Sequence, residues 1–549
     1  MKTRAVDARA SKKSGKDVEE PSQGVAHIDD AVNREYQKMF SVFDSDSDGL
    51  IDKHELFDFL EKSGILLNDA RIQQTVDAIQ KFSSPKINFA DFKVAIGENS
   101  GLFKNIAQRR LIIPEFQTFC EEICEIFETV RSNRSGKVAD YIPELGRVDP
   151  EKYALSLTTV SGQRYALGDS QTPFCLQSTS KPITYCLALE EHGRQKVHKH
   201  VGQEPSGRGF NELSLNHKDL PHNPMINSGG IMSCSLIRSD LNLADRFDYI
   251  LQAWSKLSGN ARLNFNNPVY LSERETADRN FALGYFMREK KTFPAGSDLV
   301  QTLEFYFQCC SIEIDVEGLS VVAASLANGG VCPISGEKVF SPTTVQNCLS
   351  LMGSCGMYDF SGEFAFSIGL PAKSGVSGAV MVVIPNVMGF AIWSPRLDAH
   401  GNSVRGIEFC QHLVEQYNFH IYDTILVDSS KKKDPRLKKS ASKIEAVVQL
   451  CWAASQGDLF EVQNLISNGA NPDGADYDGR TPLHLAASEG HEAVVLYLTS
   501  KCRNISPVDR WGGTPLSDAK KSRKLEIIRF LEEAILAHPA GNGASALQI

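Results

Sequence analysis

Apolar residues recur every three or four positions in parts of this chain. The clearest stretch is Phe116–Arg131, with apolar residues at Phe119, Ile123, Ile126, Phe127 and Val130. This period places the apolar side chains on one face of a helix. A second helix is predicted over 180–191, where His192-Gly193 ends it.

Short apolar runs predict strands on both sides of a helical middle region. They lie at 153–160, 164–167, 364–368, 380–384 and 389–393, with Ser161-Gly162 as the turn between the first two. Pro385-Asn386 interrupts the longest apolar stretch, so we expect two buried strands there and no membrane span. Strands at both ends of a helical middle predict an antiparallel sheet with helices packed on it, an α+β domain over 111–425.

Twelve residues near the N-terminus, 44–55, match the pattern of an EF-hand calcium loop. Carboxylates stand at its first, third and fifth positions, Gly49 at the sixth and a glutamate at the twelfth. The predicted ligands are Asp44, Asp46, Asp48, the carbonyl of Leu50, Asp52 and Glu55. We expect one Ca²⁺ in an all-α, EF-hand-like domain over 26–110. The alternative is an acidic loop that binds no ion.

A degenerate copy of this loop follows at 81–92. Its exit half resembles that of the first loop, but its entrance lacks carboxylates and has Pro85 where glycine is expected. We interpret this copy as a structural partner whose backbone near Ile87 pairs with Ile51, and not as a metal site.

The C-terminal region repeats with a period of 33 residues. The sequence 481–487, which begins Thr-Pro-Leu-His, returns in part at 514–519, and Ala453-Ala454 stand one period before Ala486-Ala487. This pattern is typical of ankyrin repeats. We expect an all-α ankyrin array over 444–538 that binds a protein partner or docks within the chain.

Length and composition indicate where these regions begin and end. A chain of 549 residues is too long for one core, and its net charge of -9 argues against nucleic acid as the main partner. Basic residues predict a disordered leader at 1–25 and a solvated basic linker at 426–443, and we expect a flexible tail at 539–549. The 13 cysteines lack metal-site spacing and no secretory signal is recognised, so we expect free thiols in a reducing compartment.

Two short motifs in the middle region carry chemistry. Ser178 and Lys181 form a Ser-x-x-Lys element, and Lys373-Ser374-Gly375 follows far along the chain. Positions i and i+3 share one face of a helix, so Lys181 can reach the Ser178 hydroxyl and take its proton. In this order the motifs are typical of serine amidohydrolases of the β-lactamase and DD-peptidase (penicillin-binding) type.

Longer matches make the middle region resemble the glutaminase family, the serine-dependent enzymes that hydrolyse glutamine to glutamate and ammonia. The matching segments are 139–143, 174–178, 221–227, 272–275, 278–280, 355–360 and 371–376. With its helical leader and ankyrin tail, the whole arrangement resembles the animal kidney-type and liver-type enzymes. The resemblance implies a β-lactamase-like α+β core.

The resemblance also implies a role for each matching residue. Ser178 would be the nucleophile and Lys181 its base, with Tyr358 and Tyr141 relaying protons and the N–H groups of Ser178 and Val376 forming the oxyanion hole. The implied substrate-binding set is Gln177, Ser178, Asn227, Glu273, Asn280, Tyr306, Tyr358 and Val376. Glu273 suits the substrate's ammonium, and Asn and Tyr donors suit its carboxylate.

The family further implies a homotetramer, possible activation by phosphate and no cofactor for catalysis. Its members and the basic start of the chain favour mitochondria, with the cytoplasm as the alternative. Two other functions stay open: another β-lactamase-like amidohydrolase, and a non-enzymatic calcium-responsive scaffold. Glu273 argues against the first, and the intact Ser178 and Lys181 argue against the second.

Overall fold

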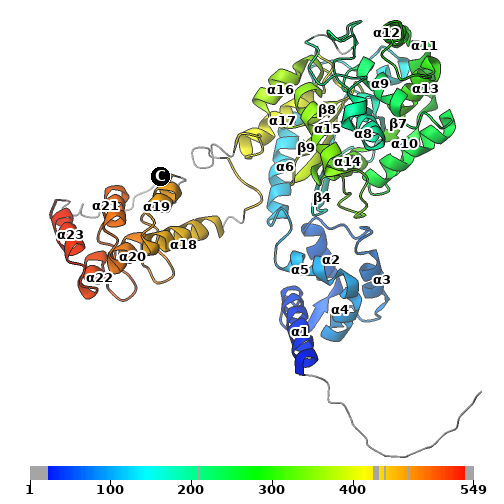
Figure 1. Cartoon of the computed structure of the whole chain (residues 1–549). Helices are drawn as coiled ribbons and strands as arrows, with labels where there is room; N and C mark the ends of the chain where they lie inside the picture. The colour runs from blue at the N-terminus through cyan, green and yellow to red at the C-terminus, as the bar shows by residue number, and fades with distance from the viewer. Residues whose placement is uncertain are drawn as a thin grey trace, which may run out of the picture. The chain divides into compact units, whose positions relative to one another are not determined.

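The computed structural model describes residues 23–207, 209, 211–423, 432–437, 441–467 and 470–537. The chain forms two compact units, Met1–Glu61 with Leu67–Arg110 and Lys62–Leu66 with Leu111–Ile549. Figure 1 shows the elements of both units. Nearly all of the predicted leader, half of the predicted linker and the predicted tail lie outside the described residues.

The first unit is helical and contains one short β-pair. Its helices are α1 (Gln23–Phe43), α2 (Lys53–Lys62), α3 (Gln73–Lys81), α4 (Phe89–Ile96) and α5 (Ser100–Ala107), with the 3-10 turn η1 (Gly97–Asn99). Strand β1 (Leu50–Asp52) pairs antiparallel with β2 (Lys86–Asn88), and Ile51 lies opposite Ile87. The predicted pairing of the two loops is confirmed.

Phenylalanine side chains from α1, α4 and α5 form the core of the first unit. The ring of Phe92 lies 5.6 Å from Phe40, 5.8 Å from Phe43 and 6.4 Å from Phe103, measured between centroids. Such aromatic pairs stabilise a core beyond the area that they bury. This core holds α1, the helix that enters the predicted calcium loop.

The second unit contains a five-stranded antiparallel sheet of order β4-β3-β10-β9-β8. Its strands are β3 (Ala154–Thr159), β4 (Arg164–Gly168), β8 (Ala372–Ser374), β9 (Ala379–Ile384) and β10 (Met388–Trp393). Strand β10 pairs with β3 in register from Met388↔Thr159 to Trp393↔Ala154. The sheet therefore joins the early hairpin to the late strands, and the predicted α+β class is confirmed.

Side chains of the sheet alternate between two apolar cores. Met381 and Val383 belong to one core, while Val380 and Val382 belong to the other. Helix α14 (Val316–Ala327) contributes to the first core, and α6 (Phe116–Arg131) and α17 (Val404–Gln416) contribute to the second. All residues of β3, β9 and β10 are buried, and β9 and β10 accordingly contain no polar side chain.

A helical layer and a second sheet complete the globular part of the second unit. The small sheet has the order β5-β7-β6, with β5 (Phe174–Cys175), β6 (Asn264–Phe265) and β7 (Ile312–Ile314). The remaining elements are α7 (Pro143–Gly146), η2 (Gln177–Ser180), α8 (Lys181–Val197), α9 (Asn227–Leu236), α10 (Leu243–Leu257), α11 (Asn267–Glu275), α12 (Asp278–Glu289), α13 (Leu299–Cys310), α15 (Pro342–Cys355), η3 (Tyr358–Phe360) and α16 (Ser361–Ser367).

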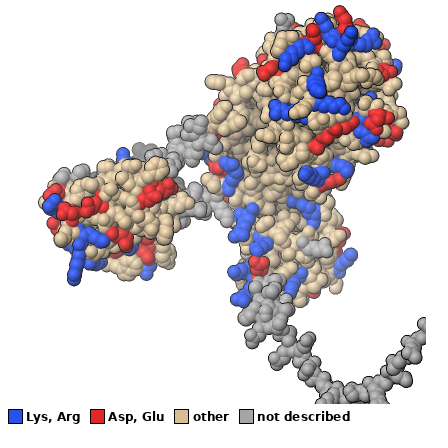
Figure 2. All heavy atoms as spheres, in the orientation of Figure 1, with Lys and Arg blue, Asp and Glu red and all other residues tan. Residues whose placement is uncertain are grey.

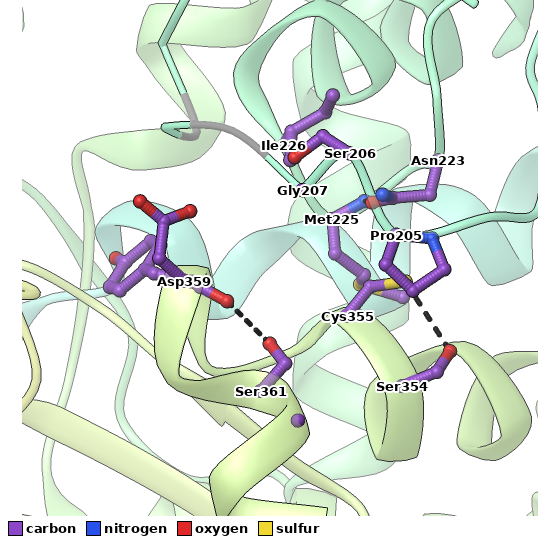
Figure 3. A pocket seen from close by; sticks show the side chains of 12 residues that line it. Pro205, Ser206, Gly207, Asn223, Met225, Ile226, Ser354, Cys355, Asp359 and Ser361 are labelled. Atoms are coloured by element: carbon purple, nitrogen blue, oxygen red, sulfur yellow. Dashed lines mark hydrogen bonds between the residues drawn. The ribbon is translucent and has the colours of Figure 1, made fainter.

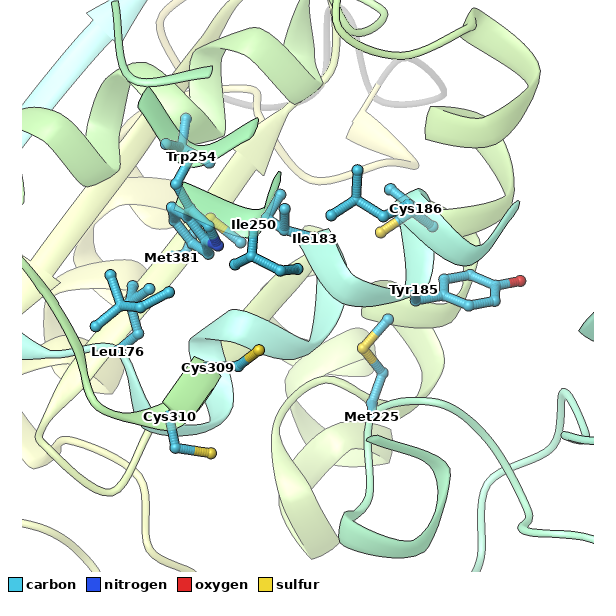
Figure 4. Packing of buried hydrophobic residues seen from close by; sticks show 14 of the residues in the cluster. Leu176, Ile183, Tyr185, Cys186, Met225, Ile250, Trp254, Cys309, Cys310 and Met381 are labelled. Atoms are coloured by element: carbon cyan, nitrogen blue, oxygen red, sulfur yellow. The ribbon is translucent and has the colours of Figure 1, made fainter. Parts of the chain in front are cut away.

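Helix α8 passes through the first apolar core. Leu176, Ile183, Ile250, Trp254 and Met381 pack around it with nearly no exposed surface (Figure 4). Gly193 has φ 72° and ψ 159°, so the helical backbone is interrupted close to the predicted end at 192–193. The N-terminal end of α8 is therefore fixed from beneath by close packing.

The predicted strand at 364–368 is wrong, because this segment forms α16. Phe364 and Ile368 are buried, but Phe366 between them is 88% exposed. The two buried side chains are one helical turn apart, and the N–H of Ile368 donates to the carbonyl of Phe364. Apolar residues at every second position suggested a strand, although only two of them face the core.

All 13 cysteines are free, and eleven of them are buried. Cys124 and Cys502 are partly covered. Burial raises the pKa of the Cys410 thiol to about 12, so this group is protonated at neutral pH. The cysteines therefore act as small apolar residues.

The described part of the predicted linker is bound to the second unit. Lys432 forms an ion pair of 2.8 Å with the buried Asp423, and Lys433 forms one of 2.7 Å with Glu122. The backbone of Lys433 also exchanges hydrogen bonds with Gln416 and Asn418. These two lysines are contact residues and not part of a solvated tether.

Three helix pairs form the C-terminal array among the described residues. They are α18 (Ala441–Gln456) with α19 (Leu459–Ser467), α20 (Pro482–Glu489) with α21 (Glu492–Lys501), and α22 (Pro515–Lys521) with α23 (Leu525–Ala537). Thr481 and Thr514 begin α20 and α22 with capping boxes. The repeated Thr-Pro dipeptide therefore marks the start of equivalent helices.

Charged side chains of both signs lie side by side over the face shown in Figure 2. Single acidic residues alternate there with single lysines and arginines, so no broad field of one sign covers the described residues on this face. Among the described residues, no helix combines the length and the apolar character needed to cross a bilayer.

Gly389 of β10 allows α14 to lie directly on the sheet. A Cβ atom at this position would stand 2.3 Å from the backbone N of Ala324 and 2.5 Å from the backbone C of Ala323. Neither backbone atom can move without shifting the helix. The close approach of α14 to β10 therefore depends on glycine at this position.

The substitution Gly389→Ala should lower the free energy of unfolding by at least about 2 kcal/mol, because the added methyl overpacks a backbone contact. Gly353→Ala is the matched control, since nothing lies within 4 Å of its Cβ position on α15. Chemical denaturation of the full chain measures both, and the control should be as stable as the wild type. Equal stability of all three proteins would contradict this contact.

Candidate functional site

The start of α8 brings Ser178 and Lys181 together. Ser178 lies in the 3-10 turn η2, Lys181 begins α8, and the Lys181 Nζ donates to the Ser178 Oγ at 2.7 Å. Both residues are buried. A hydroxyl in contact with an amine that can accept its proton is the arrangement of an activated nucleophile.

Lys181 lies in a pocket that disfavours its charge. Its Nζ donates at 2.9 Å to Oδ1 of Asn227 and lies 5.7 Å from the ring centroid of Tyr306. A Cβ on Gly230 would stand 2.8 Å from the Lys181 Cε, so glycine makes room for the lysine stem. Burial lowers the pKa of Lys181 from 10.5 to about 8, which leaves a substantial neutral fraction near neutral pH.

Glu273 of α11 is a buried carboxylate next to the dyad. It accepts hydrogen bonds from the Tyr141 hydroxyl at 2.6 Å and from Nε2 of Gln177 at 2.9 Å. Tyr141 is half exposed overall, but its hydroxyl end is enclosed beside Glu273. Burial raises the pKa of Glu273, and these two hydrogen bonds act in the opposite direction. A cationic group of a ligand would relieve the cost of this buried charge.

Asn227 links the predicted base Lys181 to two of the predicted substrate-binding residues. Its Oδ1 accepts from Lys181 and from the Tyr306 hydroxyl at 3.2 Å, and its Nδ2 donates to Oδ1 of Asn280 at 3.2 Å. These side chains come from α8, α9, α12 and α13, which pack on one another. The result is a neutral polar wall beside Ser178.

Tyr358 and Lys373 lie on the other side of Ser178. Burial raises the pKa of Tyr358, and an interaction with the Ser178 side chain acts in the opposite direction. Lys373 Nζ lies 4.5 Å from the Tyr358 ring centroid and donates to the carbonyls of Gly356 and Ser374 at 3.0 and 2.6 Å. Burial, together with the charge of Lys181, lowers the pKa of Lys373 well below its ordinary value. Sequence analysis found Lys373 through its motif but gave it no role.

Val376 follows β8 in the turn that leads to β9. Its side chain packs against a small apolar cluster that contains Ile142, Cys175 and Val269. The preceding Gly375 donates its N–H to the carbonyl of Ala379 at 2.9 Å, which fixes this turn. The predicted oxyanion donor is thus held between the two strands.

Two residues of the site have left-handed backbone conformations. Gln177, directly before Ser178, has φ 49°, and Tyr358 has φ 54°. Residues other than glycine pay for this conformation, and such strain collects at functional sites. No sequence pattern predicted the left-handed backbone at either position.

A cavity of about 380 Å³ opens beside Tyr358 (Figure 3). Its lining includes Cys355 at the end of α15, together with Pro205, Ser206 and Met225 from the segment before α9 (Figure 3). The lining also includes Ile226, which directly precedes Asn227. The size is at the low end of small-molecule sites, which suits an amino acid better than a bulky ligand.

Residues 136–422 match the glutaminase family profile. The chain belongs to the glutaminase family. The predicted family and its enzyme class, an L-glutamine amidohydrolase, are confirmed. Profiles for an EF-hand domain and for ankyrin repeats (3 copies) match residues 36–114 and 450–538.

Relatives of nearly full length support this membership. The chain is 44% identical over 517 residues to "Putative glutaminase 3" of Caenorhabditis elegans, a match that spans 92% of this chain and 88% of the relative. It is 45% identical over 487 residues to "Glutaminase liver isoform, mitochondrial" of Mus musculus, across 87% and 81% of the two chains. The similarity to these relatives therefore extends beyond the core at residues 136–422.

A solved structure matches the core alone. The "Probable glutaminase ybaS" is 33% identical to this chain, with a TM-score of 0.53, across 55% of this chain and 97% of that one. The glutaminase core thus also occurs as a chain of its own.

The EF-hand loop brings together three of its six predicted ligands. Carboxylate oxygens of Asp44, Asp46 and Asp48 lie within 4.8 Å of one another. Asp52 instead accepts from the N–H groups of His54 and Glu55 at the start of α2. Glu55 accepts from the Ser45 hydroxyl at 2.6 Å, and the exposed Leu50 follows the turn at Gly49. The oxygen-rich set fits a hard cation such as Ca²⁺.

Lys86 of β2 already supplies positive charge to this loop. Its Nζ lies 2.5 Å from Oδ2 of Asp48 and 3.3 Å from Oδ2 of Asp46. The hydrogen bond with Asp48 is the main cause that raises the pKa of Lys86, to about 12. The degenerate second loop thus acts on the first through Lys86. Sequence analysis missed it, although the pairing of Ile51 with Ile87 places Lys86 opposite Asp52.

Proposed function

We propose that this chain hydrolyses the side-chain amide of L-glutamine through a glutamyl ester on Ser178. The observation that carries the mechanism is the 2.7 Å contact between the Lys181 Nζ and the Ser178 Oγ in a buried site. A lysine whose pKa is lowered to about 8 can accept the serine proton near neutral pH. No cofactor is required for either step.

In the first step neutral Lys181 takes the proton of the Ser178 hydroxyl, and the Ser178 Oγ attacks the amide carbon. The N–H groups of Ser178 and Val376 hold the resulting oxyanion, which is typically worth about 3 kcal/mol per donor. The carbon–nitrogen bond then breaks, and the proton on Lys181 passes to the leaving nitrogen through Tyr358. Ammonia leaves, and a glutamyl ester remains on Ser178.

In the second step a water molecule replaces ammonia. Lys181 accepts a proton from the water, whose oxygen attacks the ester carbon. The bond to the Ser178 Oγ breaks, Ser178 recovers its proton from Lys181, and glutamate is released. The interaction of Tyr358 with the Ser178 side chain supports Tyr358 as the proton relay, since the Tyr141 hydroxyl donates to Glu273 instead.

Specificity for free glutamine rests on two groups of polar residues, which are Glu273 with its partners and the neutral polar wall around Asn227. Glu273 would bind the α-ammonium, and Tyr141 and Gln177 orient Glu273 through their hydrogen bonds. Asn227, Asn280 and Tyr306 would hold the α-carboxylate with neutral donors. A β-lactam or peptide would leave Glu273 buried without a cation, which disfavours the alternative amidohydrolase.

Ser178→Ala should lower glutamine turnover by at least about 10³-fold while leaving the fold intact. Ser180→Ala is the matched control, because the Ser180 Oγ donates to the carbonyl of Gln177 at 2.8 Å instead of meeting Lys181. Ammonia release from glutamine measures both. Wild-type turnover in Ser178→Ala, with loss in Ser180→Ala, would show that the nucleophile is wrongly assigned.

The value of kcat/KM should rise with pH and level off above a pH of about 8, because only the neutral Lys181 accepts a proton. The slope should approach tenfold per pH unit well below that pKa. Initial rates across the range, with stability checked at each pH, provide the test. A profile that is flat or falling through this range would exclude Lys181 as the base.

Calcium binding at the EF-hand loop is a second function that we propose. The supporting observation is Lys86, whose ammonium lies between Asp46 and Asp48 where a cation is expected. Calcium would displace this side chain and draw Glu55 and the Leu50 carbonyl toward the ion. One ion per chain is expected, since the entrance of the second loop lacks carboxylates.

Lys86→Gln should bind calcium severalfold more tightly than the wild type, and roughly tenfold at most because exposed ion pairs are weak. Lys81→Gln removes the same charge from an exposed position on α3 and should bind like the wild type. Glu55→Gln should lose most of the affinity. Calorimetric titration measures all four proteins, and equal affinity in the two lysine variants would contradict competition by Lys86.

Three expectations rest on the family resemblance. They are a homotetramer, activation by phosphate and a mitochondrial location, the last supported also by the basic residues among 1–16. Sedimentation, rates with added phosphate, and imaging of the tagged chain test them in turn. A diffuse cytoplasmic signal would replace the mitochondrial proposal. The partner of the ankyrin array stays open.

A further inference from the structure

A second cavity, of about 290 Å³, lies behind the segments that carry the site. Its lining includes Leu145 of α7, Cys175 of β5, Val269 of α11 and Ser377 of the turn after β8. Each lies within four residues of a predicted catalytic or substrate-binding residue, namely Tyr141, Gln177, Glu273 and Val376. A ligand in this cavity would therefore touch all four segments.

The lining combines an aromatic wall with buried polar atoms. The rings of Phe174 and Trp393 stack with centroids 5.3 Å apart and planes 14° apart. Within the described residues, the Ser377 Oγ and Oε2 of Glu144 are buried and have no hydrogen-bond partner. Ser377 is 7% exposed. Buried polar atoms are normally paired, so these two have capacity for a ligand.

The charges around this cavity favour a cation. Three carboxylates line it, those of Glu144, Asp149 and Glu313, against the single ammonium of Lys152. The Lys152 Nζ already forms an ion pair with Oδ1 of Asp169 at 2.5 Å. A hydrogen bond with Ser272 lowers the pKa of Glu144, so Glu144 carries its charge at neutral pH. A protonated amine would meet the charged Glu144 carboxylate, whose Oε2 has no hydrogen-bond partner among the described residues, and an aromatic face.

We propose that this cavity is a second small-molecule site, which binds a compact organic amine with an aromatic or apolar body. The ammonium lies on Glu144, the body lies along Phe174 and Trp393, and Ser377 contributes a hydrogen bond. Because Ser377 directly follows Val376, occupancy restrains the turn that holds the predicted oxyanion donor. The effect on turnover rests on the proposed function, whereas binding itself does not.

The probe for binding is 2-phenylethylamine, titrated by calorimetry into the full-length protein with saturating glutamate present. Binding should persist with glutamate, because the active site is then already filled. The uncharged 2-phenylethanol has the same body and should bind at least tenfold more weakly. Binding that glutamate abolishes, or equal binding of the two probes, would overturn the proposal.

Two variants locate the site. Glu144→Gln keeps the side-chain shape and should weaken the amine at least tenfold. Val148→Trp fills the cavity and should abolish binding, while Val300→Trp, at an exposed position on α13, should not. Unchanged affinity in Glu144→Gln would overturn the assignment even if Val148→Trp fails to fold.

Turnover is measured separately. Saturating 2-phenylethylamine should change kcat for glutamine at least twofold in the wild type and leave it unchanged in Glu144→Gln. Binding without any change in kcat would overturn the coupling to Val376. A protein that binds the amine but releases no ammonia from glutamine would refute the proposed function and leave the second site intact.

Discussion

The burial of Lys181 is the constraint on which the rest of the site depends. An ammonium group is unfavourable in an apolar core, and burial therefore moves the pKa of Lys181 toward neutrality. This requires close packing around α8, which Ile183 and its neighbours provide, and space for the lysine stem, which Gly230 provides. A looser core would admit water and restore the charged form. The chemistry of Ser178 is thus a property of the packing.

The backbone around Ser178 is fixed from both sides. Left-handed conformations at Gln177 and Tyr358 carry an energetic cost that the surrounding structure must offset. Gln177 follows strand β5, while Tyr358 lies beneath the buried amine of Lys373, which donates to two backbone carbonyls. Lys373 therefore orders the peptide backbone next to Tyr358, and its position on the edge strand β8 ties that order to the sheet.

The parts of the fold with regular local patterns were predictable. The helix over Phe116–Arg131, the hairpin at 153–167 and the pairing of Ile51 with Ile87 follow from period and turn chemistry. The prediction of a strand from Phe364 to Ile368 was wrong, because apolar residues at alternate positions fit a strand as well as two turns of a helix. Lys86 was missed because its contact with Asp48 spans the β1–β2 pair, and local patterns do not report such contacts.

For the candidate site, residue types and their order were predictable from the sequence, but little of the geometry was. Ser178 and Lys181 could be placed in contact because three residues separate them on a helical turn. The resemblance named Tyr141 as a proton relay, yet its hydroxyl lies on Glu273, a contact that depends on how α11 packs. The left-handed backbone at Tyr358 was not predictable, because no glycine stands at this position. Long-range packing decides these features.

The free cysteines have a consequence for chemical labelling. Thiol reagents attack the thiolate, and eleven cysteines are enclosed, including Cys310 and Cys355 close to the catalytic residues. Burial also raises the pKa of the partly covered Cys502 to about 12. Cys124 on α6 is therefore the thiol that an electrophile meets first. A fluorophore or spin label can be attached there to report on the enzyme without entering its active site.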